Sequence, residues 1–417
     1  MNLKEKIPND YKNIINKITK AASLGGYTVY AVGGFVRDMV MSRMPNDLDI
    51  MVEKENGGIE FSKFLSKELK ISQPVIFERF GTAKLSIDGR EIEFIMPRKE
   101  YYDENSRNPD TEIGSLMQDA LRRDFTVNAL FLRLNDMELV DLLNAGLKDI
   151  ENKIIRVTDS SAADIIFSQD PLRILRAVRQ SCQLGFSIEE QTYLSMKKNA
   201  GRLEIVSPER IRDEVNKMIE CQTVQQAFKM LDGLGLLEFI FPGIKKEKIS
   251  YSFFKEILKE DKIVLTLAFL LSDNAKSERI LINLKYSKDF IKEVLSVSEA
   301  YEYLKNHINE LSVRQIRQFE KKYRDVFIIL KKLCLLSDKE QFNNLFEKIN
   351  EMSLKNELIP QSELFSGDDL MSIFDKPAGK WISDIKNYVE ELLCDNPKIS
   401  KEEALENIKL WLKKQSL

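Results

Sequence analysis

Hydrophobic and polar positions in the first third of the chain alternate between helical and strand spacing. Residues 1 to about 24 carry apolar side chains at helical intervals and predict an amphipathic helix. The run TVYAVGG combines β-branched and aromatic residues and ends in glycines, which predicts a strand leading into a tight turn. Beyond Asp38, MVMSRMP predicts a short helix that stops at Pro45, and LDIMV predicts a second strand.

The following segments predict one more helix and two hairpins. FSKFLSKELK has helical spacing, and the strand-like runs AKLSI and EIEFIMP are joined by an Asp88-Gly89 turn. A second hairpin is predicted from ALFLRLN and ELVDLL. These elements together predict a small mixed sheet with covering helices.

Strand patterns fade from about residue 160. Segments such as DPLRILRAVRQSCQLG, SPERIRDEVNKMIE and VQQAFKMLDGLGLLEFI repeat apolar residues at helical spacing. We therefore expect an α+β protein, with a small mixed-sheet head followed by an all-helical remainder. At 417 residues the chain is long enough for several domains.

Composition excludes several kinds of site. The single histidine, His307, excludes a Ser/His/Asp triad in the first half and a multi-histidine metal site, and is predicted to be a surface or cap residue. Four dispersed cysteines form no CxxC pair, which argues against a zinc site or a disulfide framework. The sequence shows neither a signal peptide nor a long apolar run, so we expect a cytoplasmic protein that spans no membrane.

Charge is almost balanced, with 63 Lys+Arg against 66 Asp+Glu. No global basic field therefore indicates nucleic-acid binding, and any RNA contact must come from a local patch. Lysine clusters after residue 220 are individually more typical of solvated helix faces than of a binding surface.

Asp47 and Asp49 are the first candidate catalytic residues. Nucleotidyl transfer needs divalent metal ions held by hard oxygen ligands, and alternate residues of a strand point to the same side. On spacing alone, such a pair is more often part of a solvated loop. Upstream, Gly33 and Gly34 allow close backbone approach to a phosphate and Arg37 adds a cation, although this stretch can also be a simple helix-capping turn. Their combination within 17 residues favours the phosphate-binding interpretation.

A second constellation lies in QDPLRILRAVR. Asp170, Arg173, Arg176 and Arg179 recur every three residues and form a polar stripe close to one helix face. An aspartate and an arginine can offer acceptors and donors to a base edge, so a protein could select a nucleotide without a template. Arginine stripes are otherwise common on solvated faces.

Five motifs occur in order: AVGGFVRD, NDLDI, RRDFTVNAL, DPLRILRAVR and SPERIRDEVNKMI. In this respect the chain resembles the class II tRNA nucleotidyltransferases and related bacterial poly(A) polymerases of the polymerase β superfamily, over about residues 25 to 220. The resemblance implies a head at 1–157, a nucleobase-binding neck at 158–220, a body at 221–310 and a tRNA-binding tail at 311–417.

The resemblance also implies roles for individual residues. It makes Asp47 and Asp49 magnesium ligands, Asp170 and Arg173 the residues that choose C or A, and assigns nucleotide contacts to Gly34, Arg37, Arg123, Arg176 and Arg179. Gln169 stands where the family usually has a glutamate, and we expect it to be tolerated because Asp170 and Arg173 make the base contacts, although its support of Asp170 is in doubt. Glu93 is the nearest third carboxylate, although alternating Glu91 and Glu93 more simply face solvent.

The polar stretch 98–124 has no clear periodicity and predicts a mobile loop. In the resembling family such a flexible segment accompanies addition of the terminal A, which argues against a CC-only enzyme. The expected activity is addition of CCA to the 3′ end of tRNA from CTP and ATP, with Mg²⁺ as cofactor and no obligate protein partner.

Three alternatives stay open from sequence. The chain could be an A-adding enzyme or poly(A) polymerase, because these share all five motifs. It could be a catalytically silent RNA-binding protein, although Asp47 and Asp49 are both present. A nucleotidyltransferase acting on a small molecule would not require the long helical half.

Overall fold

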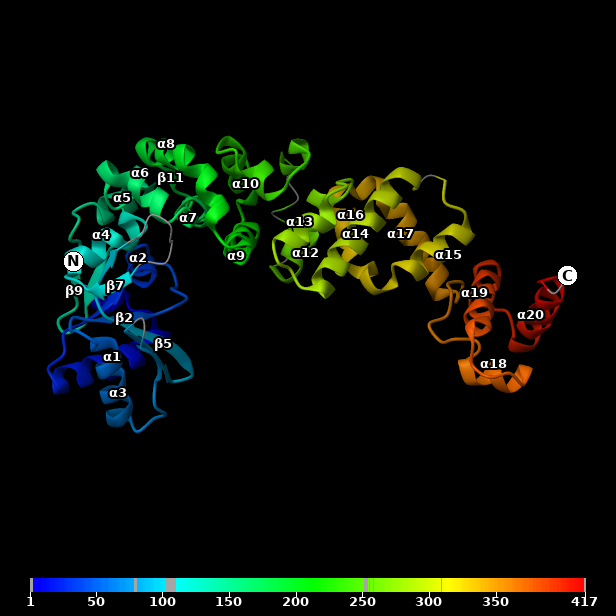
Figure 1. Cartoon of the computed structure of the whole chain (residues 1–417), viewed down its shortest axis with the longest axis horizontal. Helices are drawn as coiled ribbons and strands as arrows, with labels where there is room; N and C mark the ends of the chain where they lie inside the picture. Colours follow the sequence, from blue (N-terminus) through cyan, green and yellow to red (C-terminus); the bar gives the residue numbers. More distant parts are fainter. Residues whose placement is uncertain are drawn as a thin grey trace. The chain divides into compact units, whose positions relative to one another are not determined.

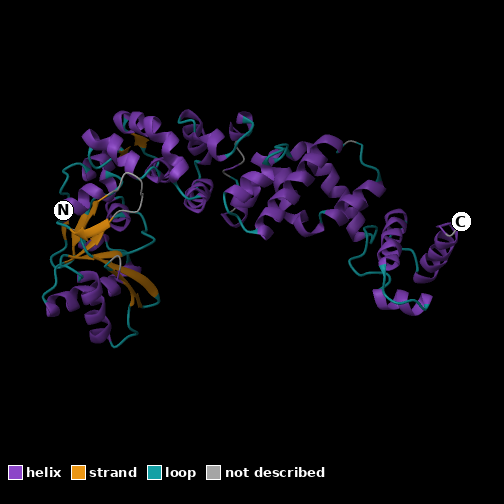
Figure 2. Ribbon diagram, in the orientation of Figure 1, coloured by secondary structure: helices purple, strands orange, loops and turns teal. Residues whose placement is uncertain are grey.

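A computed structural model describes residues 3–78, 81–101, 110–250, 254, 256–257, 259–308 and 310–415. The chain divides into two compact units, Met1–Ile240 and Phe241–Leu417 (Figure 1). The first holds the β-sheet and the second is helical in its described part (Figure 2). The predicted α+β class is confirmed, whereas the finer division into head, neck, body and tail stays a prediction.

The main sheet has the strand order β3-β4-β5-β2-β1-β8-β9. Only the neighbours β2 and β5 run parallel, so the sheet is mixed as predicted. Both predicted hairpins form, and Asp88 and Gly89 have the two positive φ angles, 51° and 78°, that a type I′ turn requires. The strands are β1 (Val29–Val32), β2 (Asp49–Val52), β3 (Val75–Phe77), β4 (Thr82–Ile87), β5 (Arg90–Ile95), β8 (Phe131–Arg133) and β9 (Glu138–Val140).

Both faces of the central strands are covered, because alternate side chains enter different hydrophobic clusters. Val29 and Ala31 of β1 join the cluster with α1 (Asn9–Gly25), α2 (Gly34–Val40) and α3 (Gly57–Leu69). Their neighbours Tyr30 and Val32 join a second cluster on the opposite face, with residues of β8 and of α4 (Leu116–Arg122). Burial on both faces holds β1 and β2 rigidly, and their ends carry the candidate site.

Two sequence predictions are wrong in this unit. The helix expected beyond Asp38 begins earlier, at Gly34, because Gly33 takes a positive φ of 71° that starts it; the helix also ends at Val40, well before Pro45. The polar stretch 98–124 is not one loop, since β6 (Arg98–Tyr101) pairs with β7 (Asp110–Ile113) and α4 follows. Cross-strand pairing and the Ser115 capping box, not hydrophobic periodicity, form these elements. The middle of the stretch lies outside the described residues.

The rest of the first unit is helical, as predicted, apart from one short strand pair, β10 (Ile154–Ile155) with β11 (Ser187–Ile188). Gly185, with φ 72°, ends α7, and Pro208 begins α9 at a position where its missing N–H has no cost. Helices α7 and α9 pack against each other. The helices are α5 (Gly146–Asn152), α6 (Ala163–Gln169), α7 (Leu172–Leu184), α8 (Glu190–Asn199), α9 (Pro208–Ile219), α10 (Val224–Gly233) and α11 (Leu236–Ile240).

The second unit packs around the apolar helix α12, which contacts α14 and α16. A separate cluster joins α18, α19 and α20, where Trp411 stacks on Tyr388 at 4.8 Å and Trp381 contacts Phe374 edge-on. Both tryptophans therefore pack against aromatic side chains of this cluster. The helices are α12 (Lys262–Leu271), α13 (Ser277–Asn283), α14 (Lys288–His307), α15 (Val313–Lys322), α16 (Phe327–Ser337), α17 (Lys339–Leu354), α18 (Gly367–Phe374), α19 (Lys380–Asp395) and α20 (Lys401–Gln415).

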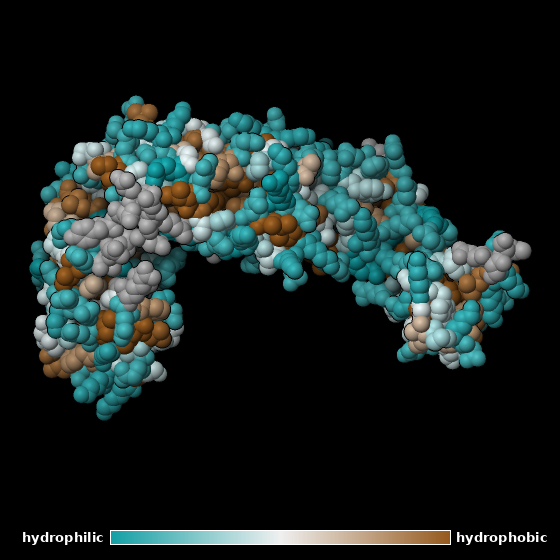
Figure 3. All heavy atoms as spheres, in the orientation of Figure 1, coloured by the Kyte–Doolittle hydropathy of each residue, from teal (hydrophilic) through white to brown (hydrophobic). Residues whose placement is uncertain are grey.

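The visible surface is mainly hydrophilic, the single histidine is exposed and the cysteines are buried. Figure 3 shows hydrophilic side chains over most of the visible face, and exposed large hydrophobic residues such as Leu24, Ile328 and Leu354 are scattered along the chain. His307 is exposed at the end of α14, as predicted, and the four cysteines are buried thiols. None of the helices in the described part is both long and apolar enough to cross a membrane.

Candidate active site

A cleft of about 740 Å³ in the first unit brings together the predicted metal ligands and nucleotide contacts, whereas Glu93 is not part of its lining. Its walls come from the β1–α2 turn, the start of β2, the segment after α4, and helices α7 and α9. The predicted residues among its lining are Gly34, Arg37, Asp47, Asp49, Arg123, Asp170, Arg173, Arg176 and Arg179. Segments separated by more than 100 residues in the sequence therefore meet at one site.

The glycine turn leaves room beside two guanidinium groups. A Cβ atom at Gly33 would lie 3.1 Å from Nη1 of Arg123, and one at Gly34 would lie 3.5 Å from Nη2 of Arg37. Gly33 also needs its positive φ, which L side chains rarely adopt. The turn therefore brings bare backbone and two cations to the same wall of the cleft.

Asp49 is the first residue of β2, and Asp47 is an exposed residue just before the strand. Burial raises the pKa of Asp49 to about 6, and the negative charges of Glu93 and Asp47 add to the effect, while Arg123 opposes it. The strand register places Glu93 directly beside Asp49. The preferred prediction that both glutamates face solvent therefore holds for the exposed Glu91 and is wrong for the half-buried Glu93.

This acidic pair fits a hard divalent cation. Asp47 and Asp49 offer oxygen donors, and a cation bound between them would offset the burial and the neighbouring negative charges that raise the pKa of Asp49. Among the described residues, no group of three His, Cys, Asp or Glu side chains converges as a metal site. Magnesium is commonly held by one or two carboxylates and completes its shell with water and substrate phosphates, which matches such a donor set.

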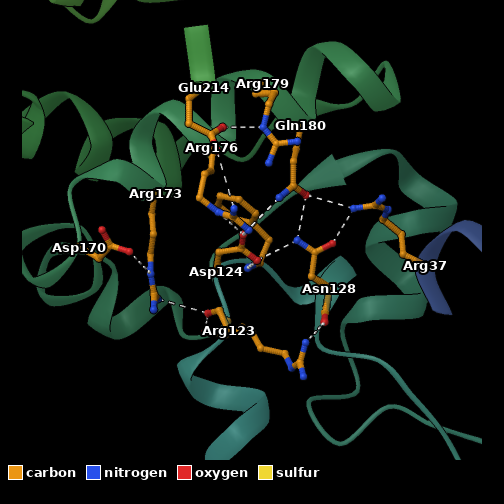
Figure 4. A network of polar contacts seen from close by, with 12 residues as sticks. Arg37, Arg123, Asp124, Asn128, Asp170, Arg173, Arg176, Arg179, Gln180 and Glu214 are labelled. Atoms are coloured by element: carbon orange, nitrogen blue, oxygen red, sulfur yellow. Dashed lines mark hydrogen bonds and ion pairs between the residues drawn. The ribbon is translucent and has the colours of Figure 1, made fainter. Parts of the chain in front are cut away.

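Asp124 lies at the centre of a polar network in the wall of the cleft (Figure 4). One carboxylate oxygen accepts from Nε and Nη2 of Arg176, at 2.9 and 2.5 Å, and from Nε2 of Gln180; the other accepts from Nδ2 of Asn128 at 2.8 Å and from the backbone N–H of Phe125. Burial opposes ionisation, but Arg176 and these hydrogen bonds outweigh it and hold the pKa of Asp124 well below its usual range.

Arg37 connects helix α2 to this network. Its Nε donates to Asp38, and its Nη1 donates to Oδ1 of Asn128 at 2.8 Å and, more weakly, to Oε1 of Gln180 (Figure 4). Arg123 is held similarly, since its Nε donates to Asp119 at 3.0 Å and its Nη1 to the carbonyl of Asn128. Both cations are therefore oriented before any ligand is present.

Asp170 and Arg173 lie at the junction of α6 and α7. Arg173 is only 9% exposed and donates to the backbone carbonyls of Arg122 and Arg123, at 2.7 and 3.4 Å, while its Nε lies 3.7 Å from Asp170 (Figure 4). Oδ1 of Asp170 is buried and has no hydrogen-bond partner among the described residues. Gln169, the last residue of α6, is half-buried, and no side-chain hydrogen bond connects it to Asp170 in the described structure.

Arg176 and Arg179 face carboxylates. Arg176 binds Asp124 and approaches Glu214 of α9 at 3.9 Å, whereas Nε of Arg179 lies 2.6 Å from Glu214. Asp124, Asn128 and Glu214 are not among the residues predicted from sequence, although all three lie inside the motifs RRDFTVNAL and SPERIRDEVNKMI. A polar residue that interrupts an apolar helix face, as Glu214 does, was the available signal.

Three domain families match the chain in succession. Residues 29–156 match the poly A polymerase head domain, 185–248 match the "Probable RNA and SrmB- binding site of polymerase A", and 256–408 match domain 2 of tRNA nucleotidyltransferase. The chain belongs to the tRNA nucleotidyltransferase and poly(A) polymerase family. The resemblance seen in the five motifs is thereby confirmed, and the family extends into the helical half where no motif was found.

Individual relatives agree with this assignment. A CCA-adding enzyme of Bacillus pumilus is 28% identical over 93% of this chain and 93% of its own. An A-adding tRNA nucleotidyltransferase of Geobacter sulfurreducens is 34% identical over 60% of this chain and 28% of its own. The Bacillus stearothermophilus CCA-adding enzyme in complex with CTP has the same fold, with a TM-score of 0.76 at 20% identity over 98% of this chain and 99% of its own.

Proposed function

We propose that this enzyme adds CCA to the 3′ end of tRNA from CTP and ATP without a nucleic-acid template. The observation that carries the proposal is the single cleft that joins the carboxylate pair, the glycine-arginine turn and the Asp170/Arg173 pair. Relatives named CCA-adding enzymes that align along almost the whole chain support it. The cytoplasmic location expected for such an enzyme remains a prediction, testable by cell fractionation.

In the proposed reaction the RNA 3′-hydroxyl attacks the α-phosphate of the nucleotide, and the bond to the leaving pyrophosphate breaks. Asp47 and Asp49 would hold magnesium ions, which when bound would acidify the attacking hydroxyl and stabilise the developing charge on pyrophosphate. Gly33 and Gly34 would admit the triphosphate close to the backbone. Arg37, oriented by Asp38 and Asn128, would neutralise part of its charge without having to reorganise.

The choice of nucleotide is proposed to lie with Asp170 and Arg173. The open acceptor Oδ1 of Asp170 can accept a hydrogen bond from the exocyclic amino group that cytosine and adenine share, and the guanidinium of Arg173 can donate one to a neighbouring ring nitrogen. Uracil and guanine present a carbonyl oxygen where those bases present the amine, so they would leave Asp170 unpaired. A buried polar group left unpaired costs about 1–3 kcal/mol, enough for strong discrimination.

Addition of the terminal A alone is the second candidate. The observation in its favour is the 34% identity with the Geobacter sulfurreducens A-adding enzyme over 60% of this chain. One experiment separates the two: purified protein is given tRNA transcripts lacking CCA, or ending in CC, with CTP, ATP or both, and the products are sequenced. Extension of the CC-ended transcript alone would refute CCA addition, and long A tracts on unrelated RNA would indicate a poly(A) polymerase.

A further inference from the structure

Almost all cations of the cleft are already engaged by the protein. Six arginines that line it each bind a carboxylate: Arg37 with Asp38, Arg122 and Arg123 with Asp119, Arg173 with Asp170, Arg176 with Asp124, and Arg179 with Glu214. These carboxylates largely compensate the positive charge of the six arginines. The arginines therefore attract a polyanion more weakly than six unpaired cations would.

Arg210 and Lys217 of α9 are the exceptions. Both line the cleft and are exposed, and neither side chain forms a hydrogen bond or ion pair with any residue that the structure describes. They are seven residues apart, so they lie on the same helix face about two turns, or roughly 10 Å, from each other. The buried Glu214 lies between them and holds Arg179, which leaves the two uncompensated charges on the solvent side.

We propose that Arg210 and Lys217 bind phosphodiester groups of the 3′-terminal strand of the RNA substrate. This inference rests on the proposed RNA-extending function. The triphosphate of the small substrate is assigned to Gly33, Gly34 and Arg37, at the head wall of the cleft. The RNA carries a phosphate at each nucleotide behind its reacting end, so exposed and uncompensated cations of the cleft are available to bind that strand.

The position of α9 supports separate binding sites for the RNA strand and for the nucleotide triphosphate. Glu220, one turn beyond Lys217, also lines the cleft. The basic strip, by which we mean Arg210 and Lys217, is therefore limited to two turns of α9. Contacts to phosphates position a strand without reading its bases. The strip would thus hold the growing end while Asp170 and Arg173 select each nucleotide.

The test replaces both cations, Arg210→Ala with Lys217→Ala, and measures steady-state nucleotide addition to a CC-ended tRNA. We expect KM for the RNA to rise about tenfold, with kcat within about twofold and KM for ATP unchanged, because two phosphate contacts are lost. The slope of log affinity for RNA against log salt should fall by about 1.4, which is about 0.7 per contact for a single strand.

Two further variants complete the experiment. Lys197→Ala with Lys229→Ala removes two exposed lysines of the same unit that do not line the cleft, and should leave the KM for RNA and the salt slope unchanged. The charge-preserving exchange Arg210→Lys with Lys217→Arg should retain the low KM for RNA.

Unchanged RNA affinity and salt slope in the alanine variant would overturn the inference, as would a rise confined to KM for ATP, because that would assign the cations to the nucleotide. If the unmodified protein extends no RNA, the proposed function itself fails. Activity of the unmodified protein therefore separates the two failures.

Discussion

Asp124→Asn should destabilise the first unit strongly although the two side chains have almost the same shape. The carboxylate accepts from Arg176 and Gln180 at one oxygen and from Asn128 and the backbone N–H of Phe125 at the other. An amide can place its oxygen on only one side, so its NH₂ must face donors on the other side. Two charge-assisted hydrogen bonds at about 1.5–3 kcal/mol each are at stake, reduced because Arg176 is 36% exposed and can be hydrated.

We therefore expect a loss of about 3 kcal/mol, which lowers Tm of this unit by about 6–12 °C. The unfolding transition would be followed by calorimetry at pH 7 and at lower pH. Because the folded-state pKa of Asp124 is depressed, its contribution is present above the unfolded pKa, about 3.9, and is lost as pH falls below it. The difference between wild type and variant should accordingly shrink towards acid.

Asp136→Asn is the matched control, since Asp136 forms an exposed ion pair with Arg133. Exposed pairs contribute little, so this variant should unfold at nearly the wild-type temperature. A Tm change for Asp124→Asn no larger than that of the control would refute the reasoning that the network depends on a buried charge.

Three other outcomes follow from the site. Asp47→Ala should abolish nucleotide addition and leave tRNA binding in a filter or gel-shift assay intact; loss of binding would contradict the metal role. Burial and like charges raise the folded-state pKa of Asp49 to about 6, so the free energy of unfolding falls as pH rises from about 4 to 6. Without added metal, the Asp49→Asn variant should therefore be more stable than wild type by about 2 kcal/mol at pH 8 and no more stable at pH 4. Denaturant titration at the two pH values measures this difference. Arg173→Ala should relax or abolish the choice between nucleotides; unchanged selectivity for CTP and ATP over UTP and GTP would count against a base contact.

Much of the fold is readable in the sequence because its signals are local. Short runs of β-branched and aromatic residues mark the central strands, and the Asp88-Gly89 pair specifies its hairpin turn through two positive φ angles. Strands β6 and β7 are an exception, because they are polar and form through their pairing with each other. The start of α2 at Gly34 has a local cause, the positive φ of Gly33, which hydrophobic spacing does not reveal.

The sequence by itself determined which residues could perform the chemistry: a carboxylate pair at strand spacing, a glycine-arginine turn, and an aspartate-arginine stripe at helical spacing. Only the tertiary structure decided which of these charges remain available. Arg176 forms an ion pair with Asp124, 52 residues away in the sequence, and Arg179 forms one with Glu214, 35 residues away. The positive charges of these two arginines are therefore compensated, whereas those of Arg210 and Lys217 are not. Periodicity places a side chain on a face of its own helix, but the partner that neutralises it comes from another element, through packing that local patterns do not encode.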